Sequence, residues 1–183
     1  MRELTDSRQS EDADQLWVCE HPPVYTLGQA GRREHIHNPG NIPIEQSDRG
    51  GQVTYHGPGQ VIVYTMIDLK RASLGVRSMV MALENSVINL LAEYDIEAAG
   101  RREAPGVYVG DKKIAALGLR VRRGCTYHGL ALNIDPDLAP FAGIDPCGYK
   151  GQVVTSTAEL GVSVPKKELV ARLVSQIQTQ LAG

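Results

Sequence analysis

Residues 104–151 read APGVYVGDKKIAALGLRVRRGCTYHGLALNIDPDLAPFAGIDPCGYKG. Two runs typical of strands, 106–109 and 112–121, are separated by Gly110-Asp111, a pair suited to a two-residue hairpin turn. The second run carries adjacent lysines, and Cys147 lies further on between turn-forming residues. The stretch therefore predicts a β-hairpin, and it offers a lysine and a cysteine as a candidate acid/base and nucleophile.

Strand alternation separates the two lysines of this hairpin. Successive side chains of a strand point to opposite faces. Lys113 is therefore expected on the more apolar face, which it shares with Ala115, Leu117, Leu119 and Val121. Burial there would disfavour the charged form and lower the lysine pKa, as an acid/base role requires. A lysine at a strand end that extends its ammonium group to solvent is an equally good interpretation.

Outside this hairpin the sequence predicts further strands and two helices. The helices are expected over residues 75–97, from apolar residues at three- and four-residue spacing, and over residues 165–181, which begin with a proline. The strands are expected at 15–20, 24–27, 52–55, 60–69 and 126–134. Residues 28–43 are rich in Gly, Pro and Asn and are expected to form a loop.

Two glycine-rich turns and several histidines admit both structural and functional interpretations. Arg49-Gly50-Gly51 and the sequence YHGPG at 55–59 suit tight turns, and they also suit a site where a ligand approaches the backbone closely. His35 and His37 are interpreted as solvated loop residues, because further metal ligands are missing around them. A single histidine in a strand, such as His128, is more often structural than a ligand.

Composition restricts the classes of protein that fit. The 183 residues carry a formal net charge of -2, which gives no reason to expect nucleic-acid binding. No apolar run approaches the length of a membrane span. Three cysteines at unrelated spacings indicate a reducing cytoplasm rather than a disulfide framework, and no spacing suggests a zinc site. One domain over residues 1–183 is expected.

Five segments, in this order, resemble one known family. They are GQAG at 28–31, RGGQVTYHGPGQ at 49–60, APGVYV at 104–109, KIAALGLR at 113–120, and HGLALN at 128–133 followed by PCG at 146–148. On these motifs the chain, over roughly residues 13 to 160, resembles the lipoyl(octanoyl) transferases of lipoate biosynthesis. The resemblance implies an α+β fold, with a mixed β-sheet core and packed helices, as in the catalytic domains of biotin protein ligases and lipoate ligases.

The resemblance also implies a set of site residues. Cys147 is expected to be the acyl-accepting nucleophile and Lys113 its acid/base partner. The acyl-binding residues are expected to be Arg49, Gly50, Gly51, Gln52, Val53, Thr54, Tyr55, His56, Ala116, Leu117, Gly118, His128, Gly129, Leu130 and Ala131.

The implied reaction moves an octanoyl group from octanoyl-acyl carrier protein to a lysine of a lipoyl domain, through a cysteine thioester. It is the first step of endogenous protein lipoylation. The implied acceptors are lipoyl domains of 2-oxoacid dehydrogenase complexes and the glycine cleavage H protein. Amide formation from a thioester is downhill, so neither ATP, nor a metal, nor another cofactor is expected. The enzyme is expected in the cytoplasm, without nucleic-acid or membrane partners.

Two other interpretations and one departure accompany the resemblance. An ATP-dependent lipoate or biotin ligase would share the fold. Its adenylate-binding loop, rich in Gly and Arg, would lie at a similar position to residues 49–56. A protein that binds acyl carrier or lipoyl domains without turnover is the second alternative, against which Cys147 and Lys113 both argue. The chain is also expected to begin within the family's first helix, which would leave it short at the N-terminus by about one strand.

Overall fold

The computed structural model describes residues 1–146 and 151–182. The helices are α1 (Arg2–Ser7), α2 (Val76–Ala92) and α3 (Lys166–Ala182), with 3-10 turns η1 (Arg33–His35) and η2 (Ala139–Gly143). The strands are β1 (Gln15–Cys19), β2 (Val24–Leu27), β3 (Ile44–Gln46), β4 (Val53–His56), β5 (Gln60–Met66), β6 (Ala99–Gly100), β7 (Gly106–Val109), β8 (Lys112–Arg122) and β9 (Cys125–Asn133).

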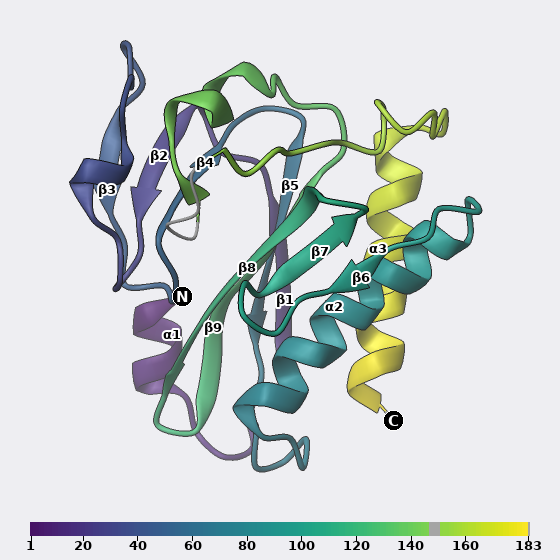
Figure 1. Cartoon of the computed structure of the whole chain (residues 1–183). Coiled ribbons are helices and arrows are strands. Elements are labelled where there is room, and N and C mark those ends of the chain that lie inside the picture. The colour runs from purple at the N-terminus through teal and green to yellow at the C-terminus, as the bar shows by residue number, and fades with distance from the viewer. Residues whose placement is uncertain (147–150, 183) are drawn as a thin grey trace.

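The strands form two sheets. The larger is antiparallel, in the order β1-β5-β9-β8-β7-β6. The smaller has the order β3-β2-β4, in which β2 runs parallel to β3 and antiparallel to β4. Strands and helices thus make the α+β fold that the resemblance implied (Figure 1).

Helices α2 and α3 lie side by side and cover one face of the large sheet (Figure 1). The apolar stripe predicted for the first helix is buried there, and Leu83 and Leu90 have no exposed surface. They pack in one core with Val63 and Leu132, which belong to adjacent strands of the sheet. Truncating a leucine in such a core to alanine typically costs about 2–5 kcal/mol. The predicted helix is confirmed but ends at Ala92, short of residue 97.

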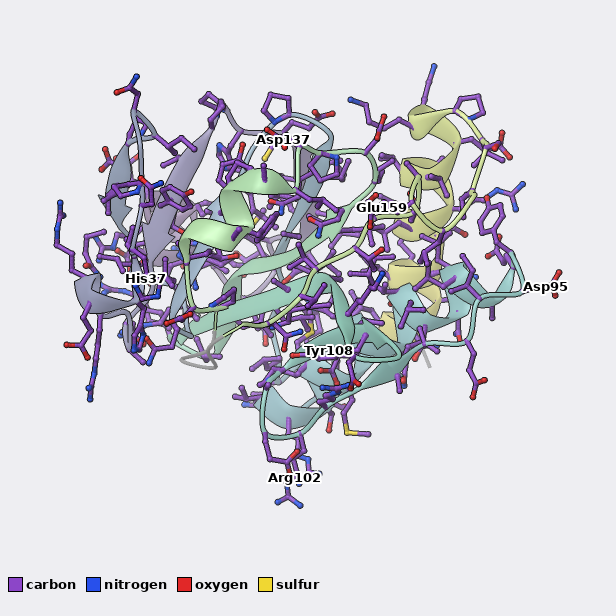
Figure 2. The ribbon with its side chains drawn as sticks, turned by 45° about the horizontal axis from the view of Figure 1, so that its top comes forward. His37, Asp95, Arg102, Tyr108, Asp137 and Glu159 are labelled. Carbon is purple, nitrogen blue, oxygen red and sulfur yellow. The ribbon has the colours of Figure 1, made fainter. Side chains whose placement is uncertain are left out.

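The loop after α2 and the loop after β6 carry side chains that point away from the body of the protein. Asp95 follows α2 with a φ of 58°, a left-handed conformation that stops the helix. Figure 2 shows Asp95 and Arg102 pointing outward. Within the described parts of the chain, no helix is both long and apolar enough to cross a membrane.

The opposite face of the large sheet turns towards the smaller sheet and η2 (Figure 1). Strand register arranges residues of this face in rows across neighbouring strands. Ile62 pairs with Ala131, which pairs with Ala116. The next row has Tyr64 opposite Gly129, and the row before it has Gln60 opposite Asn133.

A bulge changes the face on which Lys113 lies. The pairing of β7 with β8 shifts by one residue, so that Val107 lies opposite Ala115 but Tyr108 lies opposite Lys113, and Ile114 is left over. Residues opposite each other in an antiparallel pair share a face. The prediction that Lys113 lies on one face with Ala115 is therefore wrong.

Lys113 instead shares its face with Tyr108, and hence with Gly106 two residues before it. Gly106 pairs with Ala116, so this is the face that carries the rows described above. Lys113 is only 5% exposed, whereas Lys112 is exposed. Of the two interpretations left open for Lys113, the structure agrees with the buried one, although Lys113 lies on the other face.

Candidate active site

A cavity of about 510 Å³ lies between the two sheets. Its volume is within the range of about 300–1,000 Å³ that is common for small-molecule sites. Its walls come from the β1–β2 connection, the smaller sheet with the loop between β3 and β4, and from β5, β8, β9 and η2. Segments far apart in sequence therefore meet here.

Most residues that the family resemblance assigned to acyl binding line this cavity, and so does Lys113. Those that line it are Arg49, Gly51, Gln52, Val53, Thr54, His56, Ala116, Leu117, Gly118, His128, Gly129, Leu130 and Ala131. Cys147 lies outside the described residues. Pro146, which precedes it directly in the sequence, is buried and lines the cavity.

Two of the assigned residues do not line the cavity. Tyr55 is 3% exposed and packs on the far side of β4, with ring centroids 5.6 Å from Tyr25 and 5.3 Å from Phe141. Gly50 donates its backbone N–H to the carbonyl of Leu119 at 3.1 Å. A β-carbon at Gly50 would lie 2.8 Å from that oxygen, so this glycine lets the loop approach β8 closely.

Arg49 holds the wall of the cavity together. Its guanidinium donates to the backbone carbonyls of Thr26 and Gln52, both at 2.7 Å, and of Gly50 at 2.9 Å. These contacts tie the loop after β3 to β2. Arg49 thereby places a positive charge beside the cavity while its donors shape the backbone around it.

Lys113 is fixed by its backbone and by an aromatic neighbour. Its N–H donates to the carbonyl of Val153 at 2.9 Å, and its own carbonyl accepts from the N–H of Thr155 at 3.0 Å. Its Nζ lies 5.4 Å from the ring centroid of Tyr108, which is labelled in Figure 2. The tyrosine hydroxyl donates to the carbonyl of Ala104 at 2.9 Å, so the ring itself is held in place.

The chain is anchored on both sides of residues 147–150. Before them, the N–H of Asp145 donates to the carbonyl of His35 at 2.9 Å, and the Asp145 carboxylate lies 2.6 Å from Nε2 of His37. After them, Val154 forms a parallel bridge with Lys113. The second anchor lies directly at Lys113, and Pro146 and Val154, on either side of the gap, both line the cavity.

Buried amides line the same end. Nδ1 of His56 lies 2.7 Å from Oε1 of Gln60, and Nε2 of Gln60 donates to Oδ1 of Asn133 at 2.9 Å. Gln60 and Asn133 are 2% and 4% exposed, respectively. Burial lowers the pKa of His56 to about 4, so the imidazole is neutral near pH 7.

The other end of the cavity carries a second polar group. Nε2 of His128 and the hydroxyl of Tyr127 both donate to the Asp48 carboxylate, at 2.8 and 2.6 Å. Burial lowers the pKa of His128, and Asp48 opposes this shift. The Tyr64 hydroxyl lies 2.5 Å from Nε2 of His21, and burial raises the pKa of Tyr64 to about 12.

Several lining residues were not identified from the sequence. They are chiefly His21, Gln60, Ile62, Tyr64, Asn133 and Phe141. For Gln60 and Asn133 a signal was present, since each is an amide at the end of a strand, next to a run of apolar residues. Within residues 1–146 and 151–182, no cluster of three or more His, Cys, Asp or Glu side chains could hold a metal ion.

Comparison with known proteins gives relatives over nearly the whole chain. The sequence model of the lipoyl protein ligase A/B catalytic domain matches residues 1–178. An octanoyltransferase of Alkalilimnicola ehrlichii is 61% identical over 173 residues, which are 94% of this chain and 80% of that protein. An octanoyltransferase of a Shewanella species is 60% identical over 161 residues, covering 88% of this chain and 74% of the relative.

Solved structures with the same fold are more distant in sequence. A lipoate-protein ligase A bound with ATP superposes with a TM-score of 0.81 at 19% identity, covering 99% of this chain and 78% of the ligase. The biotin protein ligase of Aquifex aeolicus gives a TM-score of 0.54 at 15% identity, over 86% of this chain and 68% of that protein. At these identities the likeness extends to the fold alone.

Proposed function

The chain belongs to the lipoyl protein ligase A/B catalytic-domain family, and from that premise we propose that it is an octanoyltransferase of protein lipoylation. It takes the octanoyl group from the thioester of acyl carrier protein and transfers it to a lysine amine of a lipoyl domain. Relatives at about 60% identity that carry the name octanoyltransferase support the reaction.

One observation carries this proposal. Lys113, a buried lysine, lines the same cavity as Pro146, and Cys147 follows Pro146 directly in the sequence. A cationic lysine near a cysteine stabilises the thiolate, which is the nucleophilic form. Covalent acyl transfer requires such a nucleophile beside an acid/base group.

In the first half of the reaction, the Cys147 thiolate attacks the carbonyl carbon of the acyl thioester. A new carbon–sulfur bond forms, and the bond to the carrier's sulfur breaks. The Lys113 ammonium protonates the departing carrier thiolate. The enzyme is left with an octanoyl thioester on Cys147 and a neutral Lys113 amine.

In the second half, the neutral amine of the acceptor lysine attacks this thioester. The amide bond forms, the Cys147 thiolate leaves, and the Lys113 amine takes the proton that the nitrogen loses. The starting charges of both enzyme groups are restored. Donor and acceptor thus react in turn at one site, in ping-pong order.

The apolar middle of the cavity suits the acyl tail. The row of Ile62, Ala131 and Ala116 lies between the Gln60 and Tyr64 rows. Strands rise about 3.3 Å per residue, so the outer rows lie ~13 Å apart. An extended eight-carbon chain reaches over a comparable distance, from the Lys113 end towards Tyr64.

An ATP-dependent ligase is the second candidate, because the lipoate-protein ligase A with the same fold is bound with ATP. That likeness rests on 19% sequence identity, against about 60% for the octanoyltransferases. Acyl transfer is therefore the better-supported function. ATP–pyrophosphate exchange catalysed by the purified protein in the presence of octanoate would reverse this choice.

The experiment that tests the proposal is intact-protein mass spectrometry after incubation with octanoyl-acyl carrier protein and no ATP. We expect an adduct of one octanoyl group on the wild type and none on Cys147→Ala. Cys19→Ala is the matched control, since this partly buried thiol lies outside the cavity lining, and it should acquire the adduct. An adduct that persists on Cys147→Ala would overturn the assigned nucleophile.

A further inference from the structure

The amides next to His56 are oriented by backbone carbonyls. Nε2 of Gln60 lies 3.2 Å from the carbonyl oxygen of Tyr55, and Nδ2 of Asn133 lies 3.0 Å from the carbonyl oxygen of Thr155. A carbonyl oxygen only accepts hydrogen bonds. Each contact therefore requires the nitrogen, and not the oxygen, of the amide to face that carbonyl.

These two anchors agree with each other across the Gln60–Asn133 contact. With the Asn133 nitrogen on Thr155, its Oδ1 faces Gln60 and accepts from Nε2 at 2.9 Å. With both hydrogens of Nε2 donated, to Tyr55 and to Asn133, Gln60 has only its Oε1 left for His56. The direction of the whole chain of hydrogen bonds is thus determined.

The direction of this chain determines the tautomer of His56. An amide oxygen cannot donate, so the 2.7 Å contact with Gln60 requires a proton on Nδ1. Nε2 of a neutral imidazole then carries a lone pair and no proton. Among the described residues Nε2 has no hydrogen-bond partner, and His56 lines the cavity.

We propose that His56 Nε2 is the hydrogen-bond acceptor for an N–H of the incoming lysine amine, and that Gln60 and Asn133 are the positioning residues that keep it in this form. The role rests on the proposed function and extends it to the second substrate. With one N–H held by His56, the lone pair of the amine is left to face the thioester carbonyl. The proton lost on amide formation goes to Lys113, so His56 keeps its own protonation state.

The hydrogen bonds that run from His56 through Gln60 and Asn133 to Thr155 end close to Lys113, as this role requires. The carbonyl of Thr155 accepts from Asn133, while the N–H of Thr155 donates to the carbonyl of Lys113. The hydrogen bonds of His56 therefore end on the residue that pairs with Lys113. Both side chains line the same cavity.

The charges around His56 favour the same neutral form. Arg49, His21 and His128 are the ionisable groups that act on it, and each disfavours an added positive charge. Burial is the largest cause of the lowered pKa of His56, and the Gln60 hydrogen bond, which opposes it, has a larger effect than any one of these three charges. A neutral acceptor is compatible with a neutral amine, whereas an imidazolium would repel an ammonium group and offer it no lone pair.

The tautomer is tested without any substrate, by two-dimensional proton–nitrogen NMR of the histidine rings near pH 7. His56→Gln identifies the resonances of His56 among the five histidines. We expect a protonated Nδ1 and an unprotonated Nε2. A protonated Nε2, or an imidazolium ring, would overturn the proposal.

The role is tested by measuring the two half-reactions separately for His56→Leu and Gln60→Leu. We expect the transfer from acyl-enzyme to a lipoyl domain to fall by about ten- to a hundredfold more than acylation of Cys147. His56→Gln, whose amide oxygen can replace the Nε2 acceptor, should recover part of the transfer step. Gln176→Leu is the control and should change neither rate, since Gln176 lies outside the cavity lining and its amide donates to Glu93 at the end of α2.

The outcomes separate this role from the proposed function. A wild type that is never acylated overturns the proposed function, and this role with it. An acylated wild type whose variants lose both half-reactions equally overturns the role alone. If Gln60→Leu does not fold, His56→Leu and His56→Gln decide the matter, because they leave the Gln60–Asn133 hydrogen bond and the contacts of both amides with backbone carbonyls in place.

Discussion

The side chain of Lys113 lies across the backbone of Gly106. A β-carbon at Gly106 would lie 2.4 Å from Cε of Lys113 and 3.2 Å from its Nζ. Gly106 has a φ of 151°, a conformation that side chains rarely adopt, and its N–H donates to the Glu84 carboxylate at 2.9 Å. The lysine therefore reaches the cavity over a glycine that helix α2 holds in place.

The first prediction follows from this contact. Gly106→Ala should displace the Lys113 ammonium and reduce octanoyl transfer by at least about tenfold. The strained backbone should also lower the free energy of unfolding by about 1–3 kcal/mol. Gly110→Ala is the matched control, because its φ is also positive, at 56°, while no atom lies within 4 Å of an added β-carbon. Steady-state transfer rates and urea unfolding of both variants check this. Equal activity losses in the two would contradict it.

The second prediction concerns the two adjacent lysines. Lys113→Met should lower octanoyl transfer by about 10²–10⁴-fold, the usual contribution of a general acid/base. Lys112→Met should leave the rate unchanged, since Lys112 is exposed on the other side of the strand. Acyl-enzyme formation and transfer are measured for both variants. A fully active Lys113→Met would remove this lysine from the mechanism.

The sequence predicted the elements of the large sheet better than their details. The Gly110-Asp111 turn and the long apolar strands determine the hairpin, and β7 and β8 begin as expected. The bulge at Ile114 could not be predicted, because one extra residue among apolar neighbours leaves the pattern unchanged. Strand β3 was also missed, because its three residues are too few to show an alternating pattern. It is a strand through its pairing with β2, which is distant in sequence.

The residues of the candidate site were predictable where a sequence motif contains them. They were unpredictable where contacts between distant segments determine the conformation or the tautomer of a side chain. The motifs identified part of the cavity wall, from Arg49 to Ala131, whereas the β1–β2 connection and the lining residues of β5 were not identified. His56 was identified as a candidate, but its tautomer depends on carbonyls of Tyr55 and Thr155, a hundred residues apart in the sequence. No local pattern records such a relationship.

The third prediction concerns the length of the acyl chain. Ala116→Leu should fill the middle row of the cavity, opposite Ala131, and shorten the space for the tail. Transfer of octanoyl groups should fall more than transfer of butyryl groups, by about tenfold or more. Parallel rate measurements with both acyl donors supply the internal control. Equal losses for both chains would place the tail elsewhere.

The fourth prediction concerns the dependence of stability on pH. Burial lowers the His56 pKa from 6.5 to about 4, so between these values the unfolded chain binds a proton that the folded protein does not. The free energy of unfolding should therefore decrease as the pH falls from about 6.5 towards 4. Arg49, His21 and His128 act in the same direction.

Urea unfolding at several pH values between 4 and 7 measures this effect. His56→Leu removes the titrating group, so its free energy of unfolding should depend less on pH over this window. The comparison is made between slopes, because the substitution also changes the stability at every pH. Identical slopes for the two proteins would contradict the lowered pKa.

The strand order of the large sheet has a consequence for how the protein folds. Strand β5 pairs with β9, which joins Gln60 to Asn133 across more than a third of the chain. Contacts between such distant segments form slowly, since a long loop must close first. The cavity has walls from both of these strands, so a nascent chain has no site until β9 has been made and paired. In the proposed function, acylation therefore requires that both of these strands have already paired.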